Sequence, residues 1–236
     1  MTRRIVAVVP ARAGSSGLPG KNLMTVGGAT LVERAVRSAR DAGVLEVVVS
    51  TDGPAIAAES DRLGCTTVLR PAELSTGTSR TVDALLHAAG ELGLPDDTLV
   101  LLLQPTSPLR SAADVRATLE RHATGDVATT LTGCAAEHHP LKQLLVDAAG
   151  TATPVGTWSD LEAPRQLLPR ALRPNGAVYL TAVGDMARHR SVVVAPLAVV
   201  EMPRDRSLDV DDAETLALAR AAAEHGPDAY PGPPAG

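Results

Sequence analysis

Short apolar runs alternate with segments of helical periodicity through the first 130 positions, and this alternation constrains the fold more than any other feature. The first run, IVAVVP at 5–10, is rich in β-branched residues and ends at a proline, which is typical of a buried parallel strand. Further strands are predicted at 47–50, 66–69, 98–103 and 127–131, with helices at 31–43, 54–63, 81–92 and 112–122. This alternation predicts an α/β fold, with a mostly parallel, doubly wound, Rossmann-like sheet and helices on both of its faces.

The alternation ends near position 137. Prolines stand at 140, 154, 164 and 169 in the next stretch, where no regular period follows. We interpret residues 137–173 as an excursion from the sheet that forms a lid or a dimerisation arm. Strands are expected to return at 178–180, 192–194 and 197–200, before a last helix at 212–223. One domain is therefore predicted over 1–224, with the arm contained in about 137–195 and a disordered tail at 225–236.

The composition excludes several classes of function. A net charge of −5 argues against a general nucleic-acid binder, and an aromatic content of 1% leaves few side chains to stack on bases. No apolar run is long enough to span a membrane, and Pro10 and Arg12 interrupt the first run too early for a signal peptide. Cys65 and Cys134 stand apart in small or apolar surroundings, which indicates buried free thiols. Free thiols suit a reducing compartment, so we expect a cytoplasmic protein.

A glycine-rich loop, PARAGSSGLPGKN at 10–22, follows the first predicted strand. Its glycines at 14, 17 and 20 allow backbone N–H groups to approach a ligand closely. Arg12 and Lys21 add two cations that suit a polyphosphate. The loop is not a Walker A motif, because Ser15 occupies the position of its first glycine and Asn22 follows the lysine. The pattern predicts a phosphate-binding loop at the carboxyl end of the sheet, where open α/β folds bind ligands.

Two further polar segments are candidates for the same edge. The segment QPTSPLR at 104–110 follows the most strand-like run, although it also reads as a helix-entry loop with Ser111 as the N-cap. In the segment SLDVDD, Asp209 and Asp211 alternate on one side of an extended stretch, and two carboxylates suit Mg²⁺ together with substrate phosphates. Asp212 is expected to cap the last helix, and capping alone is the simpler explanation of this acidic segment.

The irregular stretch holds weaker candidates. Lys142, Arg165 and Gln166 lie there, and charged side chains in a proline-rich segment are usually only solvated. His138 and His139 have no third ligand at a suitable spacing, so a turn is a better interpretation than a metal site.

Taken together, these segments resemble the cytidylyltransferases that activate sialic acid and related 2-keto-3-deoxy sugar acids as CMP conjugates. The matching segments occur in the family's order over roughly 4–220: PARAGSSGLPGKN, STDGPAIAAES, LRPAEL, LLQPTSPLR, HPLK, PRQLLPRALRPNGAVYL and RSLDVDD. The pair Lys21-Asn22 is more similar to the sialic-acid type than to the ketodeoxyoctonate type.

The resemblance implies a role for each matching position. The triphosphate would be held by Arg12 and Lys21, with Gly14 and Ser15 in the same loop. The cytidine would contact the backbone near Ala11, with Asn22, Arg70 and Ser79. The sugar acid would face Gln104, Lys142, Arg165, Gln166 and Tyr179. Asp209 and Asp211 would hold Mg²⁺, with Mn²⁺ as a substitute, and would share catalysis with Arg12 and Lys21.

The resemblance also implies a homodimer with shared active sites, because the family's excursion reaches into the partner's site. That arm usually brings aromatic residues near the sugar, whereas this chain has no Phe and carries Ser191, Val192 and Val193 in their place. We expect a less filled acceptor pocket, which would admit a bulkier acid.

We therefore predict a CTP-dependent nucleotidyltransferase that joins CMP to an anionic sugar acid and releases pyrophosphate, with neither nucleic acid nor membrane as a partner. The same chemistry on another acid, such as ketodeoxyoctonate or a phosphonate, is one alternative. A non-catalytic nucleotide sensor and a sugar-nucleotide glycosyltransferase with a similar sheet are two others. The sequence leaves the general base open between Asp209 and a metal-bound hydroxide.

Overall fold

The computed structural model describes residues 3–14 and 17–225. Ser15, with its predicted place in the phosphate loop, and the predicted tail from residue 226 onward lie outside the described residues. Among the described helices, none combines the length and the apolar character needed to cross a membrane.

Strands and helices alternate as the sequence predicts. The strands are β1 (Ile5–Pro10), β2 (Thr25–Val26), β3 (Ala29–Thr30), β4 (Val47–Thr51), β5 (Thr66–Leu69), β6 (Leu99–Leu103), β7 (Thr129–Ala135), β8 (Leu144–Val146), β9 (Ala152–Pro154), β10 (Leu172–Ala182) and β11 (Leu197–Glu201). The helices are α1 (Leu31–Arg40), α2 (Pro54–Arg62), α3 (Thr81–Glu91), α4 (Ala112–Ala123), α5 (Trp158–Glu162), α6 (Val183–His189) and α7 (Ala213–His225). Short 3-10 turns include η1 (Lys21–Leu23), η3 (Pro140–Lys142) and η4 (Arg165–Leu167).

The central sheet has seven strands in the order β11-β7-β10-β6-β1-β4-β5. Strand β10 is antiparallel to both of its neighbours, and the other pairs are parallel. The chain moves outward from β1 through β4 to β5 and then crosses back to β6, so the topology reverses between β1 and β6. Doubly wound sheets bind ligands at such a switch point, beyond the carboxyl ends of the strands.

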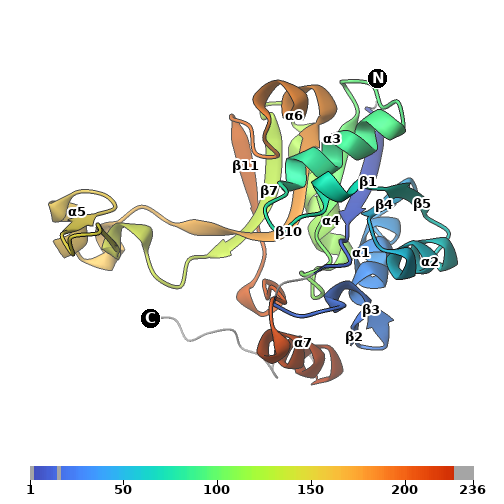
Figure 1. Cartoon of the computed structure of the whole chain (residues 1–236). Coiled ribbons are helices and arrows are strands. Elements are labelled where there is room, and N and C mark those ends of the chain that lie inside the picture. The colour runs from blue at the N-terminus through green and yellow to red at the C-terminus, as the bar shows by residue number, and fades with distance from the viewer. Residues whose placement is uncertain (1–2, 15–16, 226–236) are drawn as a thin grey trace.

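Helices cover both faces of this sheet (Figure 1), which confirms the predicted fold class. On one face, α1, α2 and α4 contribute Val32, Ile56 and Val115 to a buried cluster with alternate residues of the strands. On the other face, Leu85 of α3 and Met186 of α6 pack on the opposite set of strand residues. Strands β1, β4 and β6 are buried on both faces, which explains why their sequences are almost continuously apolar, whereas the edge strands β5 and β11 are partly exposed.

A third, smaller cluster lies beyond the carboxyl end of the sheet. Leu208 and Val210 pack there with Val26 of β2 and Leu216 of α7. This cluster fixes the segment before α7, which carries the two predicted metal ligands.

One predicted strand is wrong. Residues 192–194 form a loop, because side-chain hydroxyls bond its backbone in place of a neighbouring strand. Thr181 Oγ1 donates to the Val192 carbonyl at 2.7 Å, and the Val194 N–H donates to Thr129 Oγ1 at 2.9 Å. Three consecutive β-branched residues favoured a strand, but Pro196 follows closely and cannot donate to a ladder.

Residues 136–171 project from the body as an arm that ends in α5 and the β8–β9 hairpin (Figure 1). The predicted range of about 137–195 covers nearly all of this arm, and the rest of that range forms β10, α6 and the loop before β11. Its root is held by ion pairs from Arg170 to Glu201 and from Arg173 to Glu137. Large apolar side chains are exposed along it: Leu144, Leu145, Val146, Val155, Trp158 and Leu167.

Candidate active site

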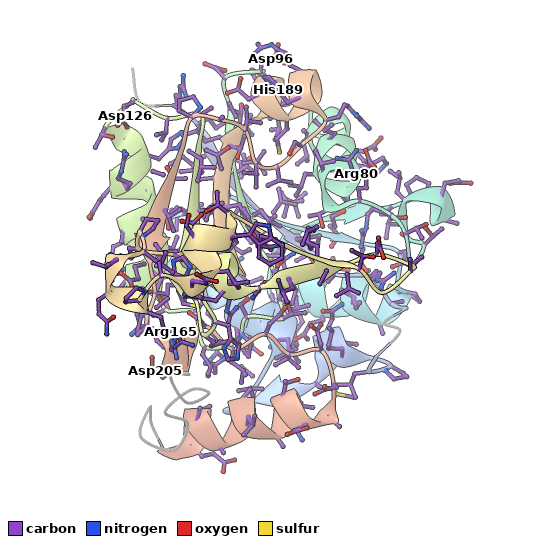
Figure 2. All side chains as sticks on the ribbon, turned by 90° about the vertical axis from the view of Figure 1, so that its left-hand side faces the viewer. Arg80, Asp96, Asp126, Arg165, His189 and Asp205 are labelled. Carbon is purple, nitrogen blue, oxygen red and sulfur yellow. The ribbon has the colours of Figure 1, made fainter. Side chains whose placement is uncertain are left out.

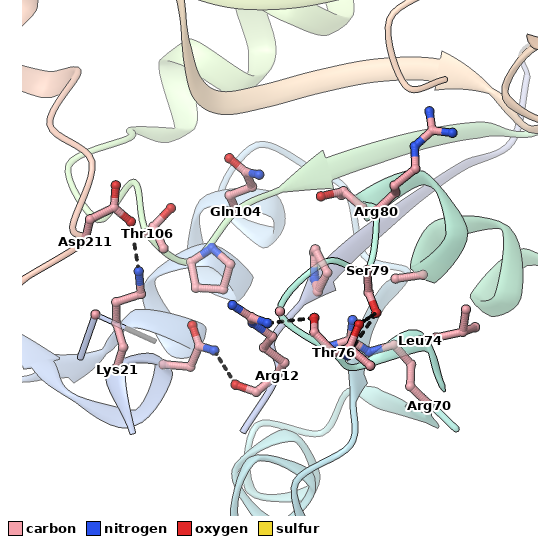
Figure 3. Close-up of a pocket in the computed structure, with 17 residues that line it drawn as sticks. Arg12, Lys21, Arg70, Leu74, Thr76, Ser79, Arg80, Gln104, Thr106 and Asp211 are labelled. Carbon is pink, nitrogen blue, oxygen red and sulfur yellow. Dashed lines mark hydrogen bonds and ion pairs between the residues drawn. The ribbon is translucent and has the colours of Figure 1, made fainter. Parts of the chain in front are cut away.

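A cleft of about 500 Å³ opens where β1, β5 and β6 end (Figure 3). This volume is in the range of small-ligand sites. The lining residues are Pro10, Arg12, Gly17, Lys21, Asn22, Arg70, Leu74, Thr76, Gly77, Ser79, Arg80, Thr81, Ala84, Gln104, Pro105, Thr106 and Asp211. Seven predicted site residues are therefore brought together: Arg12, Lys21, Asn22, Arg70, Ser79, Gln104 and Asp211.

The glycine-rich loop forms one wall of the cleft and is tied to its surroundings. Arg12 Nη1 donates to the Thr76 carbonyl at 2.8 Å, and Asn22 Nδ2 donates to the Arg12 carbonyl at 2.9 Å. The Ala13 N–H donates to Asp52 Oδ1 at 2.8 Å, so the STDG segment after β4 supports the loop from behind. Asn22 is buried, and its amide is used by this internal bond. Ala11 is also fully buried, and its N–H donates to the Ser50 carbonyl at 2.9 Å.

Arg70 forms the opposite wall of the cleft. Its Nε and Nη2 atoms are buried, and no described residue accepts a hydrogen bond from them. Burial lowers the pKa of this guanidinium, an effect that Asp52 opposes and Arg12 reinforces. Buried polar groups are nearly always hydrogen-bonded, so two donors without a protein acceptor at the wall of a cleft are an unusual feature of Arg70.

Ser79 has a different environment from Arg70. Its hydroxyl accepts from the Thr76 N–H at 2.9 Å and donates to the Glu73 carbonyl at 3.2 Å. The Ser79 side chain therefore shapes the loop between β5 and α3 while it lines the cleft.

Asp211 and Lys21 meet across the mouth of the cleft. Lys21 Nζ lies 3.1 Å from Asp211 Oδ1, with the Asp211 side chain 73% exposed. A Cβ atom added at Gly17 would lie 2.5 Å from the Asp211 carbonyl oxygen, so only glycine fits there without a shift. The Val210 N–H donates to the Thr106 carbonyl at 2.8 Å. The segment that carries both aspartates is thus held by two loops of the sheet edge.

Asp209 lies in the same acidic and basic cluster, although it does not line the cleft. Burial of its carboxyl group and the neighbouring charge of Asp211 raise the pKa of Asp209, against the opposing effects of Thr106, Lys21 and Arg173. Burial also raises the pKa of Tyr179, and the charge of Asp209 adds to that shift. Tyr179 and Asp209 are therefore electrostatic neighbours.

The two aspartates fit a magnesium ion only if substrate phosphates and water complete its ligand shell. Within residues 3–14 and 17–225, no group of three or more His, Cys, Asp and Glu side chains could hold a metal unaided. Mg²⁺ usually takes one or two carboxylates and completes its shell with water and substrate phosphates. Asp209 and Asp211 repel one another, a repulsion that a divalent cation would relieve.

His139, the other residue considered as a metal ligand, accepts a hydrogen bond from the Leu141 N–H at 3.2 Å, which agrees with its interpretation as a turn residue.

Lys142, Arg165 and Gln166 lie on the arm and not in the cleft of their own chain. Figure 2 looks along the arm from its free end and labels Arg165. Lys142 Nζ donates to the Leu161 carbonyl at 2.6 Å and also to the Ala163 carbonyl. The lysine therefore closes the end of α5 as well as carrying charge on the arm.

Several lining residues were missed by the sequence analysis. Thr76, Gly77 and Arg80 belong to the loop STGTSR between β5 and α3, and Arg80 Nη2 donates to the Arg190 carbonyl at 2.5 Å. These residues could have been predicted from the sequence, because a loop rich in Ser, Thr and Gly follows a strand at the same sheet edge. Arg173, beside Asp209, was quoted only as part of the segment at 164–180 and was given no role of its own, because it lies inside a strand.

The fold and the cleft define a doubly wound α/β protein with a ligand site at the switch point of its sheet. Residues 6–168 match the family model of the cytidylyltransferases, and the chain belongs to that family.

Curated relatives agree with this assignment, and a solved structure shares the fold. The chain is 30% identical over 210 residues to the N-acylneuraminate cytidylyltransferase of Streptococcus agalactiae, covering 87% of this chain and 50% of that protein. It is 32% identical over 215 residues to the CMP-N,N'-diacetyllegionaminic acid synthase of Legionella pneumophila, covering 88% and 91%. Its fold matches a CMP:2-keto-3-deoxy-manno-octonic acid synthetase complexed with CTP, with a TM-score of 0.69, 21% identity and coverage of 94% and 98%. The chain thus spans about half the length of the streptococcal relative.

Proposed function

We propose that this chain transfers CMP from CTP to a 2-keto-3-deoxy sugar acid, a sialic acid or a related nonulosonate, and releases pyrophosphate. The observation that carries the proposal is the convergence of Arg12, Lys21 and Arg70 on one cleft at the switch point. Three cations suit a nucleoside triphosphate, and the orphan donors of Arg70 suit a carbonyl acceptor of the base. The Streptococcus and Legionella relatives support a nonulosonate as the acceptor.

In the proposed reaction, the acceptor's anomeric hydroxyl attacks the α-phosphorus of CTP. A new P–O bond forms, the bond to pyrophosphate breaks, and the hydroxyl proton leaves. Arg12 and Lys21 hold the triphosphate with the loop at 14–15, and their charge offsets the negative charge that grows on the departing pyrophosphate. The backbone at Ala11, with Asn22, Arg70 and Ser79, positions the cytidine.

Asp209 and Asp211 would hold Mg²⁺ or Mn²⁺, which supplies neutralisation of the phosphate charge when bound. Lys21 already pairs with Asp211, so the same ammonium can turn to the phosphates once the carboxylate has another cation. Asp209 is also one of the two candidates for the base that removes the hydroxyl proton.

The acceptor would lie between Gln104 and Tyr179 of one chain and the arm of a second. Exposed Leu145 and Trp158 support a homodimer, because the arm packs no core of its own to cover them. In such a dimer, Lys142, Arg165 and Gln166 would reach the partner's cleft and meet the carboxylate of the sugar acid. We also place the enzyme in the cytoplasm, where the free thiols of Cys65 and Cys134 suit a reducing environment.

A panel of keto-sugar acids and phosphonates with CTP and Mg²⁺ tests the proposal, with pyrophosphate release and product mass as readouts. We expect the parent enzyme to turn over a nonulosonate. In Lys21→Ala, we expect turnover to fall more than CTP binding, because the charge that Lys21 meets grows in the transition state. Preference for ketodeoxyoctonate would favour the acceptor named for the CTP-bound structural neighbour. CTP binding without pyrophosphate release would favour a sensor, and consumption of a finished sugar nucleotide would favour a glycosyltransferase.

A further inference from the structure

Asn175 lies at the centre of a buried hydrogen-bond network beside the cleft. Its side chain is almost fully buried, as is that of Ser207, with residue exposures of 4% and 3%. Asn175 Nδ2 donates to Ser207 Oγ at 2.9 Å and to Met202 Sδ at 3.2 Å. Its Oδ1 accepts from Thr132 Oγ1 at 2.7 Å and from the Ala177 N–H at 3.2 Å. One amide therefore joins β7, β10 and the segment that follows β11.

This network maintains an irregularity in β10. The register of β10 against β7 shifts between Pro174 and Tyr179, and Gly176 there adopts a φ of +76°. A Cβ atom at Gly176 would lie 2.7 Å from Gln104 Oε1, so the irregular stretch forms the surface against which Gln104 rests. Tyr179, three residues after Gly176, is where regular pairing of β10 with β7 resumes.

The other end of the network reaches the aspartates. Ser207 receives the Asn175 amide and donates to the Pro203 carbonyl at 2.9 Å, which fixes the turn two residues before Asp209. Met202, the second partner of the amide, is buried at the end of β11. Asn175 thus sets the relative position of Gln104, Tyr179 and Asp209 without lining the cleft itself.

We infer that Asn175 is a positioning residue for the acceptor half of the active site, acting through Gly176 on Gln104 and through Ser207 on Asp209. This inference rests on the proposed function, because it assigns Gln104 and Tyr179 to the acceptor. The nucleotide half is built on β1, β4 and β5 and shares none of these hydrogen bonds. A change at Asn175 should therefore separate the two substrates.

The chemistry of the position favours asparagine. The side chain must donate to Ser207 and Met202 and accept from Thr132 and Ala177 at the same time, which an amide does with its two ends. A carboxylate at this position would lose the donor end and bury a charge.

The test compares Asn175→Ala, Ser207→Ala and the double variant with the parent enzyme. In Asn175→Ala we expect kcat/KM for the acceptor to fall about tenfold to a hundredfold, since small misplacements of reacting groups have effects of that size. The KM for CTP should change far less, because Arg12, Lys21 and Arg70 line the cleft without using any of these hydrogen bonds, whereas Asp209 does not line it. Ser207→Ala should lower kcat/KM for the acceptor by a smaller factor. In the double variant, the loss of activation free energy should be less than the sum of the two single losses, because both substitutions remove the same hydrogen bond.

Thr118→Val is the matched control. It removes a buried hydrogen bond of 2.9 Å to the Asp114 carbonyl, in α4, outside the network. This variant should lose thermal stability without a change in either KM. If Asn175→Ala does not fold, the test uses Ser207→Ala, in which kcat/KM for the acceptor should again fall more than the affinity for CTP.

Equal losses for CTP and acceptor, or lower thermal stability with both KM values unchanged, would overturn the inference and leave Asn175 as a stabilising residue only. Failure of the proposed function has a different signature, since the parent enzyme itself would then release no pyrophosphate with any acid in the panel.

Discussion

The cleft and the arm are built on opposite principles. In the cleft, polar side chains such as Arg12 and Asn22 are fixed by hydrogen bonds within their own chain. On the arm, the residues Leu145, Trp158 and Leu167 are 64%, 62% and 77% exposed and join none of the described hydrophobic clusters. The cleft is therefore built within one chain, and the exposed arm is the part of the molecule on which the proposed homodimer rests.

The largest effect is expected from the cleft. Asp211→Ala should lower turnover about 10²–10³-fold, the size of one lost transition-state contact, with an unchanged melting temperature. Asp212→Ala is the matched control one residue later. Asp212 Oδ1 accepts from the Thr215 N–H at 2.8 Å and caps α7, so this variant should lose a little stability and keep its turnover. Equal activity of the parent in EDTA and in Mg²⁺ would contradict a metal-binding role for Asp211.

The arm is tested by Leu145→Asp, which places a charge on its exposed apolar surface. We expect this variant to be monomeric by sedimentation, to bind CTP normally by calorimetry and to lose acceptor turnover as the dimer is lost. Leu45→Asp is the control, because Leu45 is 79% exposed but lies between α1 and β4. A monomeric parent enzyme with full activity would show that the arm completes nothing.

Arg165→Lys sharpens the division between the two substrates. We expect the acceptor KM to rise about tenfold or more and the CTP KM to stay constant, because lysine keeps the charge but loses the bidentate fork that fits a carboxylate. An acceptor that lacks the carboxylate should be poor with the parent and should lose little more in the variant. A weaker CTP affinity would move Arg165 to the nucleotide site.

The smallest effect concerns the contact between the glycine-rich loop and the Asp209–Asp211 segment. Gly17→Ala would force a Cβ against the Asp211 carbonyl, whereas a Cβ at Gly90 in α3 meets no atom within 4 Å. We expect turnover to fall about tenfold in Gly17→Ala and to change little in Gly90→Ala, measured at saturating CTP and Mg²⁺. Equal values for the two variants would contradict a tight contact in solution.

The sequence was sufficient for the sheet because buried parallel strands are continuously apolar, as VVVS at 47–50 illustrates. It was insufficient at 192–194, where β-branched residues bond to the hydroxyls of Thr129 and Thr181, a contact that no local pattern encodes. Helix α6 was missed because Gly184 interrupts its period.

The same contrast applies to the site. Arg12 and Lys21 were found because they follow a strand in a loop of glycines. Arg80 and Arg173 were not found, since their relevance depends on packing between elements that are distant in sequence. In the sequence, Asn175 is only part of a motif. That it links β7, β10 and the segment after β11 is evident only from the fold.

The arm carries Trp158, and the chain contains no other tryptophan and no phenylalanine. Indole fluorescence excited at the red edge of the absorption band therefore reports on the arm alone, without a contribution from the catalytic body. In a single chain the indole faces water, and burial by a second chain would shift its emission to the blue. Trp158 is therefore a built-in optical probe of the proposed dimer, and the dimer can be followed together with turnover in unlabelled material.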